Sequence, residues 1–141
     1  DTVLLAFNYQ APNAEIGLRQ LIKQIYQELQ PGPETDTLFW RLDVTDAATA
    51  FLNGGLRFID GANRLCYLCE VMQGNCWNDP DFSVFCLITD QADFIPSAAI
   101  RAGLSEDALE RLKHAETDLE AVHRSKAVAA ARQLIERFQL S

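Results

Sequence analysis

The chain has 141 residues, of which 48% are hydrophobic and 23% charged, and its formal net charge is −8. This is the size of one domain, with enough apolar residues to bury a core, and its composition argues against disorder. The negative charge argues against nucleic acid or an anionic membrane as a partner, because both require a basic surface. No apolar run approaches the roughly 18 residues of a membrane span. Because the chain begins at Asp1, we expect that an upstream segment was cut, removed or left out.

The first part of the chain predicts a strand, a helix and a second strand. Residues 2–9 are apolar and have the length and aromatic content of a strand. A helix follows and ends before Pro31, because apolar residues repeat at helical spacing. These residues are Leu18, Leu21, Ile22, Ile25 and Leu29. Residues 37–44 read as a second strand, with alternate side chains such as Trp40 on one face.

The middle of the chain allows more than one assignment of secondary structure. Residues 45–53 are either a short helical turn or an excursion inside a hairpin, and residues 56–59 read as a third strand. Asp60-Gly61 indicates a hairpin turn or a helix that Asp60 caps. Residues 61–73 favour a helix over a strand, because apolar residues fall at helical spacing and Gly74 sits where a helix C′ residue would be. Residues 82–89 read as a fourth strand.

This order predicts an α+β fold, a ferredoxin-like βαββαβ sheet with helices on one face, over residues 1–103. Residues 104–141 form a helical C-terminal extension, either two helices or one long helix with a register change. Ser105 is expected to cap its first helix, with Glu106 and Asp107 favourable to the helix dipole.

The first 100 residues resemble the YdhR-like mono-oxygenase family of the dimeric α+β barrel superfamily. The likeness lies in the arrangement of elements and in short words of sequence. These words are Leu5-Ala-Phe-Asn8, Leu38-Phe-Trp-Arg41, Asn53-Gly-Gly-Leu-Arg-Phe-Ile-Asp60, Leu65-Cys-Tyr-Leu68 and Val84-Phe85. The resemblance implies a ferredoxin-like protomer that pairs into a homodimer, with a cavity between sheet and helices. It does not account for the extension beyond Gly103.

The resemblance also implies a function. Some members of the superfamily oxidise quinol-like aromatics with oxygen and no cofactor, others cleave haem, and many only bind ligands. We therefore expect a cavity that holds a small apolar or aromatic ligand against Asn8, Trp40, Phe58 and Tyr67, with no cofactor and no metal. The alternative is that Asn8 ends a strand and that Trp40 belongs to the core or to a dimer interface.

Cysteines and histidines are the remaining candidates for chemistry. Cys66-x-x-Cys69 has zinc-like spacing, with Cys76 and Cys86 further along the chain. We interpret the four as reduced core thiols, because Cys66 and Cys69 lie in an apolar, helical segment. A redox pair and a metal site are the alternatives. The only histidines, His114 and His123, are expected on the surface of the extension. This disfavours haem cleavage, because the core domain would then have no histidine.

The sequence gives only weak support for a site of acid–base catalysis. Asp43, Asp46 and Asp60 cluster around the second and third predicted strands, where Arg41 and Arg57 are possible cross-strand neighbours. An ion-pair rim on a sheet is the simpler interpretation, and a carboxylate general base beside a cavity is the alternative. No phosphate loop, Ser-His-Asp set or nucleophile elbow occurs in the sequence.

Two functions remain open. The first is a small soluble cytoplasmic protein of the dimeric α+β barrel type that binds an apolar ligand, with cofactor-free mono-oxygenase activity as its enzymatic form. The second is a non-catalytic acidic interaction protein, similar to an immunity protein or an adaptor, that binds a basic protein partner through its C-terminal helices. No set of residues establishes a reaction.

Overall fold

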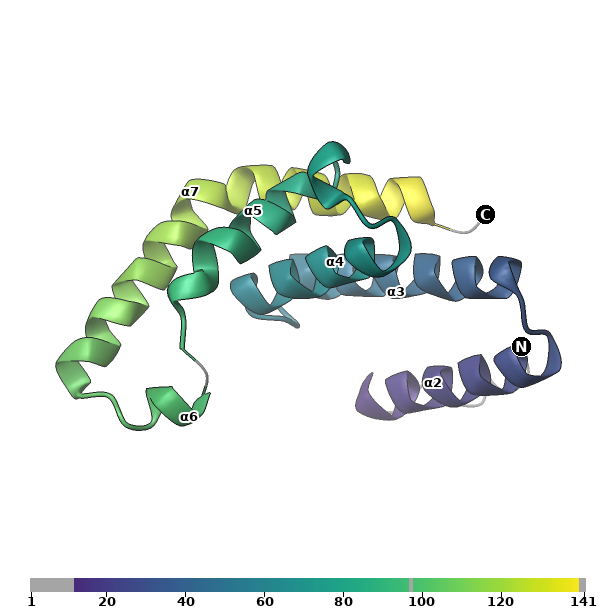
Figure 1. Ribbon diagram of the computed structural model, residues 1–141, viewed down its shortest axis with the longest axis horizontal. Coiled ribbons are helices and arrows are strands. Elements are labelled where there is room, and N and C mark those ends of the chain that lie inside the picture. The colour runs from purple at the N-terminus through teal and green to yellow at the C-terminus, as the bar shows by residue number, and fades with distance from the viewer. Residues whose placement is uncertain (1–11, 97, 140–141) are drawn as a thin grey trace. The chain divides into compact units, whose positions relative to one another are not determined.

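The computed structural model describes residues 12–96 and 98–139, and all regular elements in these ranges are helices (Figure 1). They are α2 (Pro12–Leu29), α3 (Pro33–Asn53), α4 (Phe58–Met72), the 3-10 turn η1 (Cys76–Asn78), α5 (Ser83–Gln91), the 3-10 turn η2 (Ala92–Phe94), α6 (Ala98–Arg101) and α7 (Glu106–Phe138). The chain divides into two compact units, Asp1–Trp40 and Arg41–Ser141, here called unit 1 and unit 2.

The predicted α+β fold is wrong. Across residues 12–96 and 98–139 the structure has no strand, so it has neither a ferredoxin-like sheet nor the surface on which an α+β barrel dimer would form. The second predicted strand, residues 37–44, lies inside α3, and the fourth, residues 82–89, lies almost wholly in α5. The third, residues 56–59, leads into α4. The first, residues 2–9, lies outside the described residues.

The buried residues of α3 show why the strand assignment failed. Val44, Ala47, Ala48 and Phe51 are buried at intervals of three, four and seven residues, which is the period of a helix. The alternation of Leu38, Trp40 and Leu42 spans only five residues, too short to distinguish the two periods. Burial on one helical face therefore overrides the preference of aromatic residues for strands.

Unit 1 is built from α2 and the first turns of α3. Helix α2 was predicted from its apolar period and is confirmed, ending at Leu29. The rings of Tyr26 and Phe39 pack at a centroid distance of 6.1 Å. The hydroxyl of Thr35 donates to the carbonyl of Gln30 at 2.8 Å, which satisfies one of the carbonyls left free at the end of α2.

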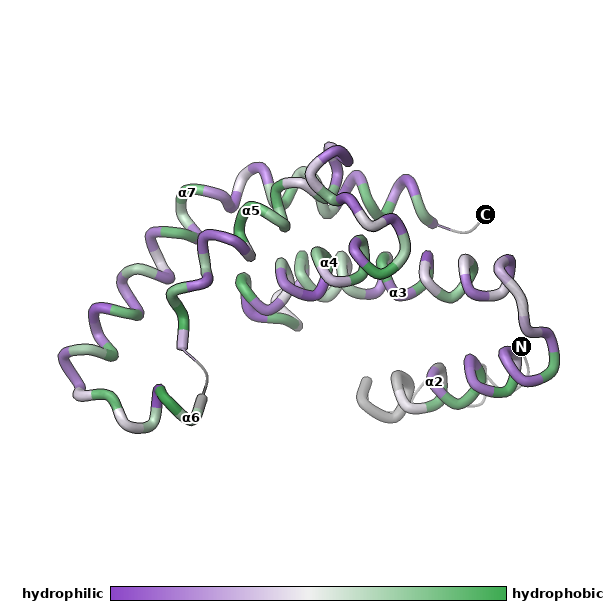
Figure 2. Tube along the Cα trace, viewed as in Figure 1, coloured by the Kyte–Doolittle hydropathy of each residue, from purple (hydrophilic) through white to green (hydrophobic). Residues whose placement is uncertain are grey.

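Unit 2 is organised around α5, which contacts α4, α7, η1 and η2. Apolar residues run along α5 and the neighbouring part of α4 (Figure 2). Phe82, Phe85 and Ile88 are fully buried there, together with Leu65 of α4. From α7 the core receives Ala127, Ala131 and Leu134, also fully buried. Small residues four apart on α7 allow its backbone to lie close to α5.

Several helices begin or end at the residues that the sequence predicts. The helix predicted at residues 61–73 is confirmed as α4, and Gly74 follows it with a φ of 80°, the left-handed conformation that glycine adopts without strain. The side chain of Ser105 accepts a hydrogen bond from the Ala108 amide at 3.1 Å, which confirms the predicted cap. Most of the predicted extension is one helix, α7, whose 33 residues span about 50 Å.

Ion pairs connect α7 to α6 and to the segments that precede α4 and α5. One guanidinium nitrogen of Arg137 lies 3.0 Å from both carboxylate oxygens of Asp79 and 3.0 Å from Asp81. Glu116 accepts from Arg101 of α6 at 2.7 Å and from Arg57 at 3.4 Å. The predicted pairing of Arg57 with carboxylates across a sheet is therefore wrong, because its partner lies on α7.

Among the described residues, no helix combines the length and the apolar character that crossing a membrane requires.

Candidate functional site

The ligand site expected from the sequence is not assembled as a unit. Asn8 lies outside the described residues. Trp40 is buried in unit 1, with 7% of its surface exposed. Phe58 packs against Phe51 with ring centroids 5.5 Å apart, whereas Tyr67 is 58% exposed. Nine residues along α4 turn the helix by about half a rotation, so Phe58 and Tyr67 face opposite sides. Their role in ligand binding stays a prediction.

The four cysteines do come together, in the interior of unit 2. Cys66 and Cys69 lie on α4, Cys76 begins η1, and Cys86 lies on α5. Each is buried, with at most 5% of its surface exposed. The predicted burial of the thiols is thereby confirmed, and all four are free rather than paired in disulfides.

The sulfur atoms of three cysteines form a compact group, here called the thiol cluster: Cys66, Cys76 and Cys86. Their Sγ atoms all lie within 4.8 Å of one another. The Sγ atoms of Cys66 and Cys86 are 3.2 Å apart, and the thiol of Cys76 lies 3.6 Å from the backbone carbonyl of Cys66. The thiol of Cys69 lies beside Cys76 and also contacts Gln73.

The surroundings of Cys66, Cys69 and Cys86 raise the pKa of each of these three thiols. Burial raises the pKa of the Cys66 thiol, and the nearby carboxylate of Glu70 adds to the effect. Burial also raises the pKa of Cys69 and of Cys86, and contacts with neighbouring thiols raise both further. Because the thiolate is the nucleophile, Cys66, Cys69 and Cys86 are poor nucleophiles at neutral pH.

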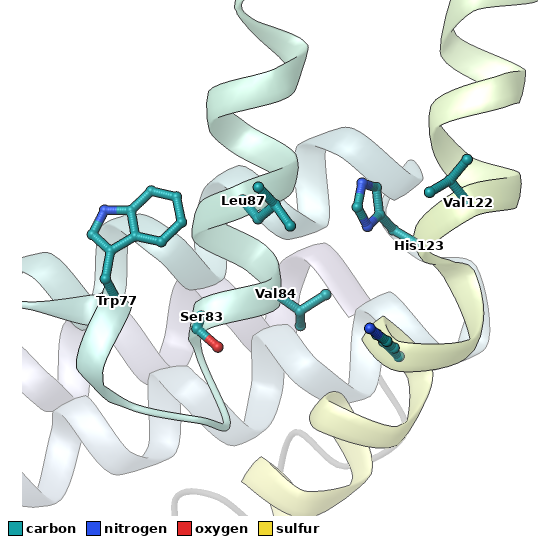
Figure 3. A pocket seen from close by; sticks show the side chains of 7 residues that line it. Trp77, Ser83, Val84, Leu87, Val122 and His123 are labelled. Carbon is teal, nitrogen blue, oxygen red and sulfur yellow. The ribbon is translucent and has the colours of Figure 1, made fainter.

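A surface groove lies nearby, between η1, α5 and α7 (Figure 3). It has a volume of about 370 Å³. Its lining residues, here called the groove residues, are Trp77, Ser83, Val84, Leu87, Val122, His123 and Lys126. Trp77 is 56% exposed and Val122 is 72% exposed, so two large apolar side chains stand at the mouth of the groove in contact with water.

His123 forms the inner wall of this groove. It is only 7% exposed, so its predicted place on the surface is wrong. Its ring lies between α5 and α7 (Figure 3), and its Nε2 is 2.6 Å from the side-chain oxygen of Gln91. Because an amide oxygen only accepts, Nε2 carries the proton. His123 thus ties α7 to the end of α5.

The groove was not predicted from the sequence, although the sequence contains two signals of it. Trp77 is a lone aromatic residue in a loop that is otherwise polar, an unfavourable place for it without a contact. His123 precedes Ala127 and Ala131 at intervals of four, which places it on the buried face of α7. Within the described residues, the groove lining contains no carboxylate that could act as a general base beside His123.

The chain matches no protein-family model, and neither a curated protein nor a solved structure is found similar to it. The resemblance to the YdhR-like family is therefore untested by these comparisons. The fold that it implies is contradicted by the helices described above, and the α+β barrel mono-oxygenase function falls with that fold.

Proposed function

We propose that this protein is a non-catalytic interaction protein that binds a short amphipathic helix of a basic protein partner in the groove between η1, α5 and α7. The observation that carries the proposal is the exposure of Trp77 and Val122 on facing sides of one groove. Exposed aromatic and aliphatic residues beside a concavity are typical of protein–protein contact sites. A helix presents apolar side chains at regular spacing, which suits a groove between two helices.

Charge supports the choice of partner. The chain carries a net charge of −8, so long-range attraction favours a basic segment. The apolar groove residues would contact the apolar face of that segment, and its basic face would lie toward the acidic surface of the protein. The polar side chains of the groove, Ser83 and Lys126, are able to fix its orientation.

The proposal is tested with synthetic helical peptides. A Lys/Leu amphipathic peptide and a Glu/Leu peptide of the same pattern are titrated into the protein by calorimetry. Only the Lys/Leu peptide is expected to bind, with an affinity that falls as salt is added. The fluorescence of Trp77 should shift to shorter wavelength on binding, because its ring leaves water.

A matched pair of variants locates the binding site. Val122→Asp places a charge in the groove, and Val71→Asp places the same charge on α4, where Val71 is 60% exposed and does not line the groove. Val122→Asp is expected to weaken binding at least tenfold, and Val71→Asp to change it less than twofold. Equal effects of the two variants, or equal binding of both peptides, would refute the groove as the site.

A further inference from the structure

The thiol cluster supports a second proposal, which does not rest on the function proposed for the groove. Its sulfur atoms come from α4, η1 and α5, which are separate elements of the chain. Core thiols that act only as small apolar side chains need contact with the core but not with one another. Convergence of three sulfurs to within 4.8 Å is a more specific arrangement.

We propose that the thiols of Cys66, Cys76 and Cys86 form a binding site for one thiophilic metal ion, Zn²⁺ or Cu⁺, in the interior of unit 2. All three donors are sulfur, the ligand type that selects these soft ions over Mg²⁺ or Ca²⁺. The hard oxygen ligands that those two ions require are absent from this three-residue group.

The distances fit such an ion. Zn²⁺ binds thiolate sulfur at about 2.3 Å, which sets tetrahedral sulfur atoms roughly 3.8 Å apart. The Sγ atoms of Cys66 and Cys86, at 3.2 Å, need to separate slightly, and no pair in the cluster exceeds 4.8 Å. Changes of this size are within reach of side-chain rotation.

The chemistry of binding follows from the protonation state. Each coordinating thiol gives its proton to the solvent as the metal–sulfur bond forms. Cys66 would then lose its contact as a donor to the Glu70 carboxylate, now at 3.7 Å. Redox exchange with another molecule is the less favoured use of these thiols, because its partner must reach the sulfur atom and each of the three residues is at most 5% exposed.

Clamping η1 against α4 and α5 is the structural effect expected of the ion. Cys76 is the buried residue of η1, and the next residue is Trp77 of the groove. A metal bond at Cys76 would therefore hold the position of that turn. It would also raise the stability of unit 2, because a ligand that binds the folded state stabilises it.

The test is a metal titration of the full chain, purified under reducing conditions and stripped with a chelator. Zn²⁺ is measured against a chromophoric chelator, and Cu⁺ anaerobically against a competing ligand. One equivalent of at least one of the two ions is expected to bind and to raise the melting temperature. Failure of both ions to bind at one equivalent would overturn the proposal.

Variants separate coordination from packing. Cys86→Ala is expected to weaken binding at least 100-fold, and Ile88→Val, a core change on the same helix, should lower stability without changing metal affinity. Cys69→Ala removes a buried thiol that is outside the three-sulfur group, and it should weaken binding less than tenfold. If Cys69→Ala weakens binding as much as Cys86→Ala does, the three-thiol site is wrong. Circular dichroism confirms that each variant is folded.

Discussion

Gly61 marks the place where α4 lies closest to the ring of Phe51. A Cβ atom on Gly61 would lie 2.5 Å from Cδ1 of that ring. The ring has little freedom to move, because Phe51 is 9% exposed and packs at 5.5 Å from Phe58 and 5.6 Å from Phe85. We expect Gly61→Ala to lower the free energy of unfolding by about 1–2 kcal/mol, since overpacking outweighs the gain in helix propensity. Urea denaturation followed by circular dichroism measures the change.

Gly17 provides the matched control. It also lies inside a helix, α2, but a Cβ there would have no neighbour within 4 Å. Gly17→Ala is therefore expected to increase helicity and to stabilise α2 by up to about 1 kcal/mol. The steric account of Gly61 would be contradicted if its substitution were as favourable as that of Gly17.

The burial of individual residues was predicted correctly for the cysteines and wrongly for His123. The burial of the cysteines followed from the apolar helical segment around Cys66 and Cys69 and is confirmed. His123 was assigned to the surface because it lies in the charged C-terminal extension, yet it is buried. Local polarity does not determine the orientation of one helical position, because the buried face depends on residues four and eight positions away.

At the scale of an element, Arg137 fastens the loop before α5 to the last turn of α7. Asp79 and Asp81 are only 10% and 20% exposed, and Arg137 forms an ion pair with both carboxylates. Burial alone would lower the pKa of Arg137, but its hydrogen bonds with Asp81 and Asp79 outweigh this effect and raise it. The arrangement therefore ties the segment that directly follows η1 to α7.

Removing this guanidinium should have a measurable cost. We expect Arg137→Ala to lower the free energy of unfolding by about 1–2 kcal/mol, an estimate reduced for solvent screening because Arg137 is 36% exposed. Arg111→Ala is the control on the same helix, because its pair with Asp107 is 76% and 88% exposed. Its expected cost is below about 0.5 kcal/mol. Thermal unfolding of both variants shows whether the loss of stability in Arg137→Ala comes from its contacts with Asp79 and Asp81 or from the loss of one positive charge on α7.

The sequence predicted the helices with a clear apolar period or clear ends, and it failed on α3 and α5, whose segments it assigned to strands. Helices α2, α4 and α7 have either a clear period of apolar residues or a clear terminal signal. Ser105 marks the start of α7, and Gly74 marks the end of α4. Segments such as residues 82–89 are rich in aromatic and β-branched residues and too short to show a period. Their helical state depends on packing between α4 and α7, which local propensity does not contain. The groove was missed for the same reason, since it is formed by separate elements. For the cysteines, the sequence offered a metal site only as an alternative to core thiols.

At the scale of the whole molecule, the division into two units predicts how the chain tolerates truncation. The core of unit 2 is formed by α3 after Arg41, α4, α5 and α7. A chain of residues 31–141 keeps these elements and the whole of α3. We expect it to unfold cooperatively, with a midpoint within a few degrees of that of the full chain, as measured by circular dichroism. Loss of the cooperative transition would mean that unit 2 does not fold without residues 1–30.

A chain of residues 1–103 tests the opposite boundary, which the sequence predicts at Gly103. Without α7 it lacks Ala127, Ala131 and Leu134, each fully buried, and it lacks the partners of Asp79 and Gln91. This loss would leave the apolar face of α5 in water, so we expect no cooperative unfolding transition and a tendency to aggregate. If residues 1–103 nevertheless fold and unfold cooperatively, α7 is an extension in the sense predicted from the sequence. The groove would then belong to two separable parts of the chain rather than to one core.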